Sequence, residues 1–311
     1  MDFRKIIAFG KSSYVISLPK KWLNNNNLEK GDLVFIEEDN DKLTLRPKEK
    51  DLPNEEKKIV INIDGKDIRS IRRVISSAYI KNNDYIIIQG KSIDKTYSEI
   101  TKIIHNFIAL EILEQSSNRI VAKDLFNVKD INIIDYIKKE DIILRSILMD
   151  LKNPDFNNYL EIIERQNNAK RIYFLISKVI KSFKDNYNSL KKANLDLKEL
   201  FEIYDLNKLL KEIAHFSKDI ALNIDKSDFK KNDSFFLIMD EFNKFYLQFM
   251  RSIRLMDKNK AFQIPESGSL LIKKINKELN PKKASEHTIV KDLIYMINII
   301  HNSSYLIIDV D

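Results

Sequence analysis

The chain contains no cysteine and few turn-forming residues, with 5 glycines and 6 prolines in 311 residues. Without cysteine, disulfide bonds and thiolate metal sites are excluded. The scarcity of glycine and proline, beside abundant Ile, Leu, Lys and Asn, favours an architecture dominated by helices. At this length we expect two or three domains.

Long uninterrupted apolar runs are also missing. The most apolar stretch, Thr288 to Val310, is interrupted by Lys291, Asp292, Asn298, His301 and Asn302. This pattern is typical of a core helix and not of a membrane span. No arginine-flanked apolar leader begins the chain, so we expect a cytoplasmic protein without membrane insertion.

Sequence patterns for catalysis are absent as well. The four histidines have no recognisable nucleophile as partner, and there is no glycine-rich phosphate loop and no Ser, His and Asp triad pattern. We therefore expect a binding or regulatory protein that is not an enzyme and needs no cofactor.

Positive charge is in excess. Lys and Arg number 53 against 46 Asp and Glu, which gives a formal net charge of +7. This balance permits contact with nucleic acid or with anionic membranes. A cluster near the start is expected where phosphates are neutralised, although it also fits a solvated surface. Asp2 is the one acidic residue in this stretch, and the basic residues of the cluster are Arg4, Lys5, Lys11, Lys20 and Lys21.

The first fifty residues predict a small β-rich unit. Gly10 to Ser13 supplies turn chemistry between two apolar runs, and Pro19 ends the second run and suits the start of a helix. A unit of this size is too small to bury its own core, so we expect support from a second copy of the chain. The expected elements are strands at Arg4–Phe9 and Tyr14–Leu18, a helical turn at Lys20–Asn26, and a hairpin of Leu33–Glu38 and Lys42–Pro47 across Asp39 to Asp41.

Two phrases in this unit, GKSSYVISLPKKWL and GDLVFIEED, resemble the swapped-hairpin DNA-binding domain of the AbrB/SpoVT family. The resemblance implies that two chains interleave their hairpins into one barrel, with basic side chains on one face of the dimer against DNA. It implies phosphate contacts from Arg4, Lys5, Lys11, Lys20 and Lys21, with Ser12 and Ser13 as further donors from the turn.

A charged stretch, Lys48 to Lys58, is expected to be a linker to a small α/β module. Arg69, Arg72 and Arg73 lie on the exposed face of the module's first helix, where they either touch phosphate or form a solvated face. The expected order is a strand at Ile59–Ile63, a helix at Asp67–Ile80, a strand at Asp84–Gln89 and a helix at Ser92–Glu114.

From Lys129 onward the pattern predicts only amphipathic helices, which divide into two sets of three. An internal echo between Ile213–Ser217 and Ile299–Ser303 supports a repeat. The helices are expected at Ile131–Leu151, Phe156–Tyr187, Leu195–Ile224, Ser234–Lys258, Glu266–Leu279 and Ala284–Val310, with breaks at Asn153–Pro154, Lys191–Asn194, Asp225–Asp233, Asn259–Pro265 and Asn280–Pro281.

The phrases Ile162–Arg165, Arg171–Ile176 and Leu210–Ala221 resemble the PhoU family. This resemblance implies two three-helix bundles in tandem and an association with the control of phosphate uptake. An AbrB-like N-terminal domain followed by a PhoU-like body is a combination found in archaeal regulators.

PhoU-like bundles carry pairs of acidic residues, spaced four apart on the inner helices, that resemble metal-binding sites. In this chain other residues stand at those positions. Gln166 and Lys170 stand in one pair of positions, and Lys211 and His215 in the other. Ammonium groups in these places should repel a divalent cation, so we expect no metal. Two alternatives remain open: a metal held by His215, Asp219 and His301, or an anion held by Lys170, Arg171 and Lys211.

Together these features predict an α+β chain of three parts. Residues 1–50 form a DNA-binding and dimerisation domain, 51–128 an α/β module, and 129–311 a PhoU-like helical domain with repeats at about 129–226 and 227–311. We expect a homodimeric transcriptional regulator that binds DNA and is linked to phosphate uptake or signalling. The alternatives are an adaptor that regulates a phosphate transporter or its kinase by protein contact, and an antitoxin-like DNA-binding partner.

Overall fold

The computed structural model describes residues 3–39, 42–47, 56–91, 93–127, 131–153, 155 and 158–307. The chain divides into two compact units, Met1–Glu55 and Glu56–Asp311. Several predictions fall in part outside the described residues: linker residues 48–55, the hairpin-turn residues Asn40 and Asp41, the helix starts at Ser92 and Phe156, the break at Pro154, and the C-terminal residues 308–311.

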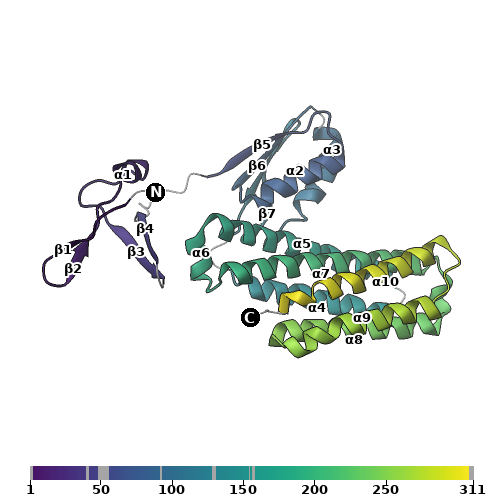
Figure 1. Cartoon of the computed structure of the whole chain (residues 1–311). Helices are drawn as coiled ribbons and strands as arrows, with labels where there is room; N and C mark the ends of the chain where they lie inside the picture. Colours follow the sequence, from purple (N-terminus) through teal and green to yellow (C-terminus); the bar gives the residue numbers. More distant parts are fainter. Residues whose placement is uncertain are drawn as a thin grey trace. The chain divides into compact units, whose positions relative to one another are not determined.

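The N-terminal unit consists of two separate β-hairpins with a short helix between them (Figure 1). In the first hairpin β1 pairs antiparallel with β2, and in the second β3 pairs antiparallel with β4. The predicted elements are therefore present, although both strands of the first hairpin are shorter than expected. The bounds are β1 Ile7–Phe9, β2 Ser13–Val15, α1 Lys20–Asn25, β3 Val34–Asp39 and β4 Lys42–Pro47.

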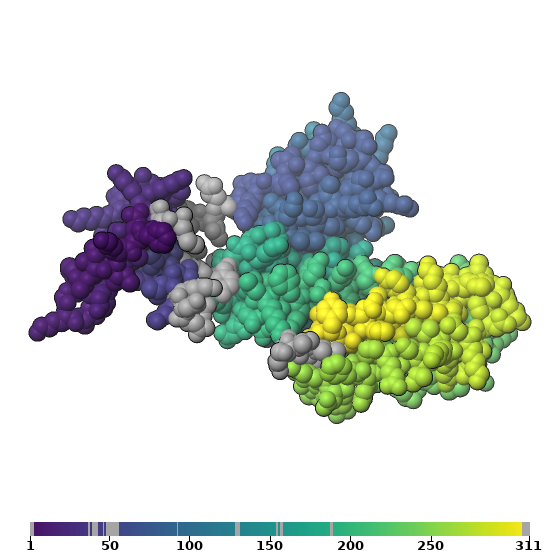
Figure 2. Space-filling view, viewed as in Figure 1, coloured from purple at the N-terminus to yellow at the C-terminus, as the bar shows by residue number. Residues whose placement is uncertain are grey.

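This unit has no interior of its own, since none of its side chains that the structure describes is buried. Phe3 is 90% exposed and Tyr14 is 75% exposed, which is unusual for aromatic residues. In Figure 2 the purple unit is thin, and its side chains project outward. The single chain thus leaves its apolar side chains uncovered, as the sequence predicts. The other exposed apolar residues are Ile6, Ile7, Phe9, Val15, Ile16, Leu33, Phe35, Ile36 and Leu43.

The second unit begins with a four-stranded sheet in the order β5-β6-β8-β7. Strands β5 and β6 are parallel, and the other pairs are antiparallel. Two helices pack on the sheet around a core of Ile, Leu and aromatic side chains. The bounds are β5 Lys58–Asn62, α2 Ile68–Ile80, β6 Tyr85–Gln89, α3 Ile93–Ile104, β7 Leu110–Ser116 and β8 Arg119–Asp124.

The predicted helix Ser92–Glu114 is wrong in its second half, because α3 ends at Ile104 and a β-hairpin follows. The buried residues Ile103, Phe107 and Leu110 continue a helical spacing through the break, so the apolar pattern conceals it. The chain turns at Ala109, whose φ of 59° lies in the left-handed region, and the Tyr79 hydroxyl donates to the Ile108 carbonyl at 3.0 Å.

Among the residues that the structure describes, the helical region contains six long helices, with the short α6 and two 3-10 turns between or after them (Figure 1). Helices α4, α5 and α7 pack against one another, and so do α8, α9 and α10; α7 meets α10 and α4 meets α8, which gives one continuous core. The bounds are α4 Ile133–Leu151, α5 Tyr159–Asp185, α6 Tyr187–Lys192, α7 Leu197–Ile224, η2 Asp228–Lys231, α8 Asp233–Leu255, α9 Lys258–Glu278, α10 Ala284–Asn302 and η3 Ser304–Ile307.

The predicted break at Asn259–Pro265 is wrong, because α9 begins at Lys258 and continues through Pro265. The Asp257 side chain caps the helix by accepting from the Lys260 amide at 3.1 Å. Proline at this place removes one backbone hydrogen bond, but Ala261 and Ile264 are fully buried, so packing offsets the loss. The last predicted helix is also too long, since α10 ends at Asn302.

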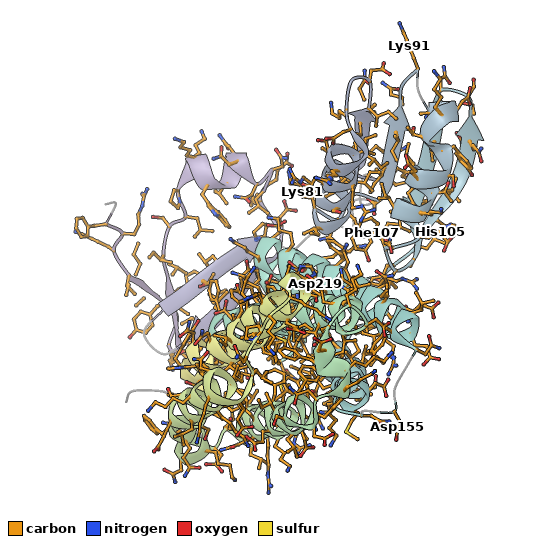
Figure 3. All side chains as sticks on the ribbon, turned by 90° about the vertical axis from the view of Figure 1, so that its right-hand side faces the viewer. Lys81, Lys91, His105, Phe107, Asp155 and Asp219 are labelled. Atoms are coloured by element: carbon orange, nitrogen blue, oxygen red, sulfur yellow. The ribbon has the colours of Figure 1, made fainter. Side chains whose placement is uncertain are left out.

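The module and the helical region of the second unit share an aromatic contact. The Phe107 ring lies 4.7 Å from that of Tyr79 on α2 and 5.1 Å from that of Phe174 on α5, measured between centroids. Figure 3 labels Phe107 where the module meets the helices. None of the described helices combines the length and the apolar character that crossing a bilayer requires.

Candidate nucleic-acid interface

The tip of the first hairpin presents three of the predicted DNA-binding residues together. Phe9 pairs with Ser13, so Gly10, Lys11 and Ser12 form the turn. Gly10 has a φ of 73°, a conformation that costs glycine little and strains other residues. The turn therefore places Lys11 and Ser12 at the tip and Ser13 at the start of β2, all three exposed.

Lys20 and Lys21 are the first two residues of α1. Pro19 precedes them in an extended conformation, and its carbonyl accepts from the amides of Trp22 and Leu23 at 3.0 and 3.1 Å. This arrangement begins the helix without a side-chain cap and leaves both lysine side chains exposed. Both ammonium groups are thus open to solvent.

Arg4 and Lys5 lie in the extended segment before β1, and both are exposed. Four residue steps of extended chain lead from Lys5 to Phe9, which corresponds to about 13 Å at ~3.3 Å per residue. The single chain therefore presents three basic groups: Arg4 with Lys5, the hairpin tip, and the start of α1.

The basic groups have the chemistry that DNA backbones require. Lys11, Lys20 and Lys21 make no ion pair with any residue that the structure describes, so no protein carboxylate there competes with phosphate. Serine hydroxyls at the turn donate hydrogen bonds to phosphate oxygens, a contact that positions a protein without reading sequence.

The exposed apolar side chains of the same unit agree with the expected support from a second copy, although sequence reasoning did not single out individual residues among them. Phe9, Tyr14 and Phe35 are more than half exposed, in strands whose backbones are paired. The signal was present, because aromatic and β-branched residues fill these strands without the polar alternation that a solvated face shows. These residues are candidates for the surface between two chains.

The residues in place of the family's acidic pairs lie on α5 and α7. Gln166 is buried, Lys170 is half-buried, and the Lys211 ammonium contacts the Glu212 carboxylate at 2.7 Å. The positive charge of Arg171 acts on the Tyr79 hydroxyl, and its buried Nε has no hydrogen-bond partner among the described residues. The anion site predicted at Lys170, Arg171 and Lys211 stays a prediction.

The alternative metal site on α7 has few ligands. His215 Nε2 lies 3.6 Å from the Asp219 carboxylate, one turn further along the helix. His301 lies in the last turn of α10. Within the described ranges, no group of three His, Asp or Glu side chains is placed to hold a metal ion.

A cavity of about 540 Å³ lies between α4, α7 and α8. Its walls are mostly apolar, with Ile137, Ile203 and Met250 among them. The Arg145 guanidinium at its rim is already paired with Asp141 at 2.6 Å. The lining suits an apolar molecule and not a phosphate.

Comparison with known families identifies the N-terminal unit. Residues 7–53 match the family described as "Antidote-toxin recognition MazE, bacterial antitoxin". This unit is a domain of the MazE/AbrB swapped-hairpin type, and such domains typically dimerise and bind DNA. No curated protein and no solved structure matches the chain. The match ends before the α/β module, so the helical region is not assigned to a family.

Proposed function

We propose that the protein is a homodimeric DNA-binding regulator whose N-terminal units assemble between two chains. The observation that carries the proposal is the coincidence, in one family-matched unit, of an uncovered apolar surface and a set of exposed basic side chains. A second copy would cover the apolar side chains. It would also duplicate the basic groups.

The helical region would act as the signal-receiving part of the regulator, as in a PhoU-like body linked to phosphate uptake or signalling. Support comes from the phrases at Ile162–Arg165 and Leu210–Ala221, and from the packing of six helices as two sets of three. A protein of this kind needs no catalytic centre, so we propose that it is not an enzyme.

Fluorescence anisotropy with a labelled DNA duplex tests the DNA role. Binding should weaken steeply as salt rises, because phosphate contacts release counterions. Lys11→Glu should weaken binding about tenfold or more, since it places a negative charge against phosphate at each tip of the dimer. Lys30→Glu, an exposed lysine of the same unit outside the three basic groups, is the matched control. Binding that is absent, or that does not depend on salt, would remove the DNA role.

The name of the matched family favours a second candidate, an antitoxin that also binds a toxin protein. The helical region would then hold the toxin, in place of the flexible tail that such partners usually carry. Co-purification of a stoichiometric small protein from the native host would favour this candidate. A dimer without DNA affinity that instead co-purifies with transporter subunits would favour the adaptor.

A further inference from the structure

Basic side chains from three helices gather around Lys170. Lys170 Nζ lies 5.9 Å from the ring centroid of Phe174 on α5, and Lys211 Nζ on α7 lies 5.8 Å from that of Tyr173. The two rings are neighbours, with centroids 5.4 Å apart. The ammonium groups of Lys170 and Lys211 therefore border one aromatic pair where α5 packs against α7.

Two more cations belong to this group: Arg72 on α2, and Lys218, which stands seven residues after Lys211 and therefore on the same face of α7. Helix α2 of the module packs on α5, the helix that carries Lys170. Burial, and then the positive charges of Arg72, Lys218 and Lys211, lower the pKa of Lys170. We name Arg72, Lys170, Lys211 and Lys218 the basic cluster.

The acidic groups nearby do not balance the basic cluster. Glu212 pairs with Lys211 at 2.7 Å, and Asp219, labelled in Figure 3, lies 3.5 Å from Lys218 and 3.6 Å from His215. Arg72 and Lys170 have no ion pair among the residues that the structure describes. Two positive charges are left over, and one of them, on Lys170, is half-buried.

A half-buried ammonium group with other cations as neighbours is unfavourable unless an anion joins it, and contact with an aromatic ring offsets only part of that cost. The cluster also contains the right donors. Arginine offers a planar fork for two oxygens of one anion, and lysines add point charges around it. An excess of two charges matches a dianion better than a chloride or a single carboxylate.

We propose that the basic cluster binds a tetrahedral dianion of the phosphate type, either free or as the terminal group of a small phosphorylated molecule. The anion would lie between α2 of the module and helices α5 and α7 of the helical region, and would fix these parts to one another. This inference stands on residues outside the N-terminal unit, so it does not depend on the DNA role.

Thermal unfolding of the full-length protein tests the proposal. Sodium phosphate, ATP and sodium chloride are compared at matched ionic strength and low millimolar anion, where general salting effects are small. We expect phosphate or ATP to raise Tm above the chloride value in a saturable way. A response to phosphate identifies the free anion as ligand, and a response to ATP alone identifies a phosphorylated molecule.

Lys170→Met separates a binding role from a structural one. In chloride the variant should melt at or above the wild-type Tm, because an unpaired charge is removed. The anion-dependent rise should be lost, or should require about tenfold more anion. Lys184→Met, an exposed lysine on the same helix, should respond like the wild type.

Two results would overturn the proposal. The first is a wild-type Tm that is the same in all three salts. The second is a Lys170→Met variant that keeps the full anion-dependent rise. If Lys170→Met does not fold, Arg72→Met gives the same decision from an exposed position on α2. DNA titration of these variants should match the wild type, which keeps a failure of this site distinct from a failure of the DNA role.

Discussion

Lys178 on α5 forms a buried ion pair with Asp124 at the end of β8, and this pair fixes the α/β module to the helical region. The side chains are 2% and 5% exposed. The Lys178 ammonium also lies 4.6 Å from the Tyr79 ring centroid, and the Lys178 carbonyl accepts from the Asn82 side chain at 3.2 Å. The connection thus combines charge, an aromatic ring and a backbone hydrogen bond.

Removing one partner of this pair should destabilise the second unit. We expect Lys178→Met to cost about 3–5 kcal/mol in urea unfolding, because Asp124 is left as an uncompensated buried charge. Lys178→Met combined with Asp124→Leu should recover much of the loss. Lys181→Met, which breaks an exposed pair with Asp185, is the control and should change stability by only about 0.5 kcal/mol. Equal losses of stability in Lys178→Met and Lys181→Met would contradict a stabilising role for the buried Lys178–Asp124 pair.

Asp292 on α10 should make stability depend on pH. Its side chain is buried, with one oxygen lacking a hydrogen-bond partner among the described residues. Burial, followed by the negative charge of Asp219, raises the pKa of Asp292 to about 6, against the opposing charge of Lys291. Between the ordinary pKa of about 4 and this raised value, the folded protein keeps a proton that the unfolded chain has released.

The sign follows from that difference in bound protons. The stabilisation from protonated Asp292 is complete below about pH 4 and is lost as pH rises through about 6. We expect Asp292→Asn to be more stable than the wild type by about 1–3 kcal/mol at pH 8, and similar to it at pH 4. Urea titrations at both values measure this. Glu164→Gln, an exposed carboxylate on α5, should keep the wild-type profile. An Asp292→Asn variant that is less stable at pH 8 would contradict the prediction.

The exposed apolar side chains predict the oligomeric state. Phe35→Asp should dissociate the dimer, because burial of one such side chain contributes about 1.5–3 kcal/mol and the dimer contains two. A rise in Kd of about a hundredfold or more is expected in sedimentation velocity. Leu237→Asp, at an equally exposed position on α8, should leave the dimer intact. A wild-type chain that is monomeric at every concentration would exclude the assembly.

The lysines at the start of α1 should set part of the salt dependence of DNA binding. We expect Lys20→Ala with Lys21→Ala to weaken binding at all DNA sequences alike, since phosphate contacts carry no sequence information. The slope of log K against log salt should become less negative by about two for each N-terminal unit that contacts DNA. An unchanged slope would show that these lysines face away from the DNA.

Local signals predicted the N-terminal unit well. Pro19 and the turn at Gly10–Ser13 act over a few residues, so their effects can be read directly from sequence. Long helices with strong periodicity were equally clear, and α4, α5 and α7 match their predicted ranges within a few residues. The predicted element boundaries were wrong at two places where a local sequence rule is overridden by packing. Leu110 continues a helical pattern across the turn at Ala109, and Pro265 lies in a helix that its buried neighbours stabilise.

The basic cluster shows a different limit. Lys170 and Lys211 were considered together because a family resemblance aligned them, but Arg72 was assigned to a solvated face of another module. Only the packing of α2 across α5 relates these residues. No periodicity or spacing in the sequence carries that information, since the contact depends on how two separate cores are joined.

Under the proposed function, the uncovered apolar surface of the N-terminal unit would link DNA-binding activity to the amount of protein present. An interior that forms only between two chains is populated according to the square of the free monomer concentration. Diluting the protein would therefore remove assembled DNA-binding surfaces faster than it removes chains. Such a regulator would respond to its own synthesis and turnover before any small molecule reaches it.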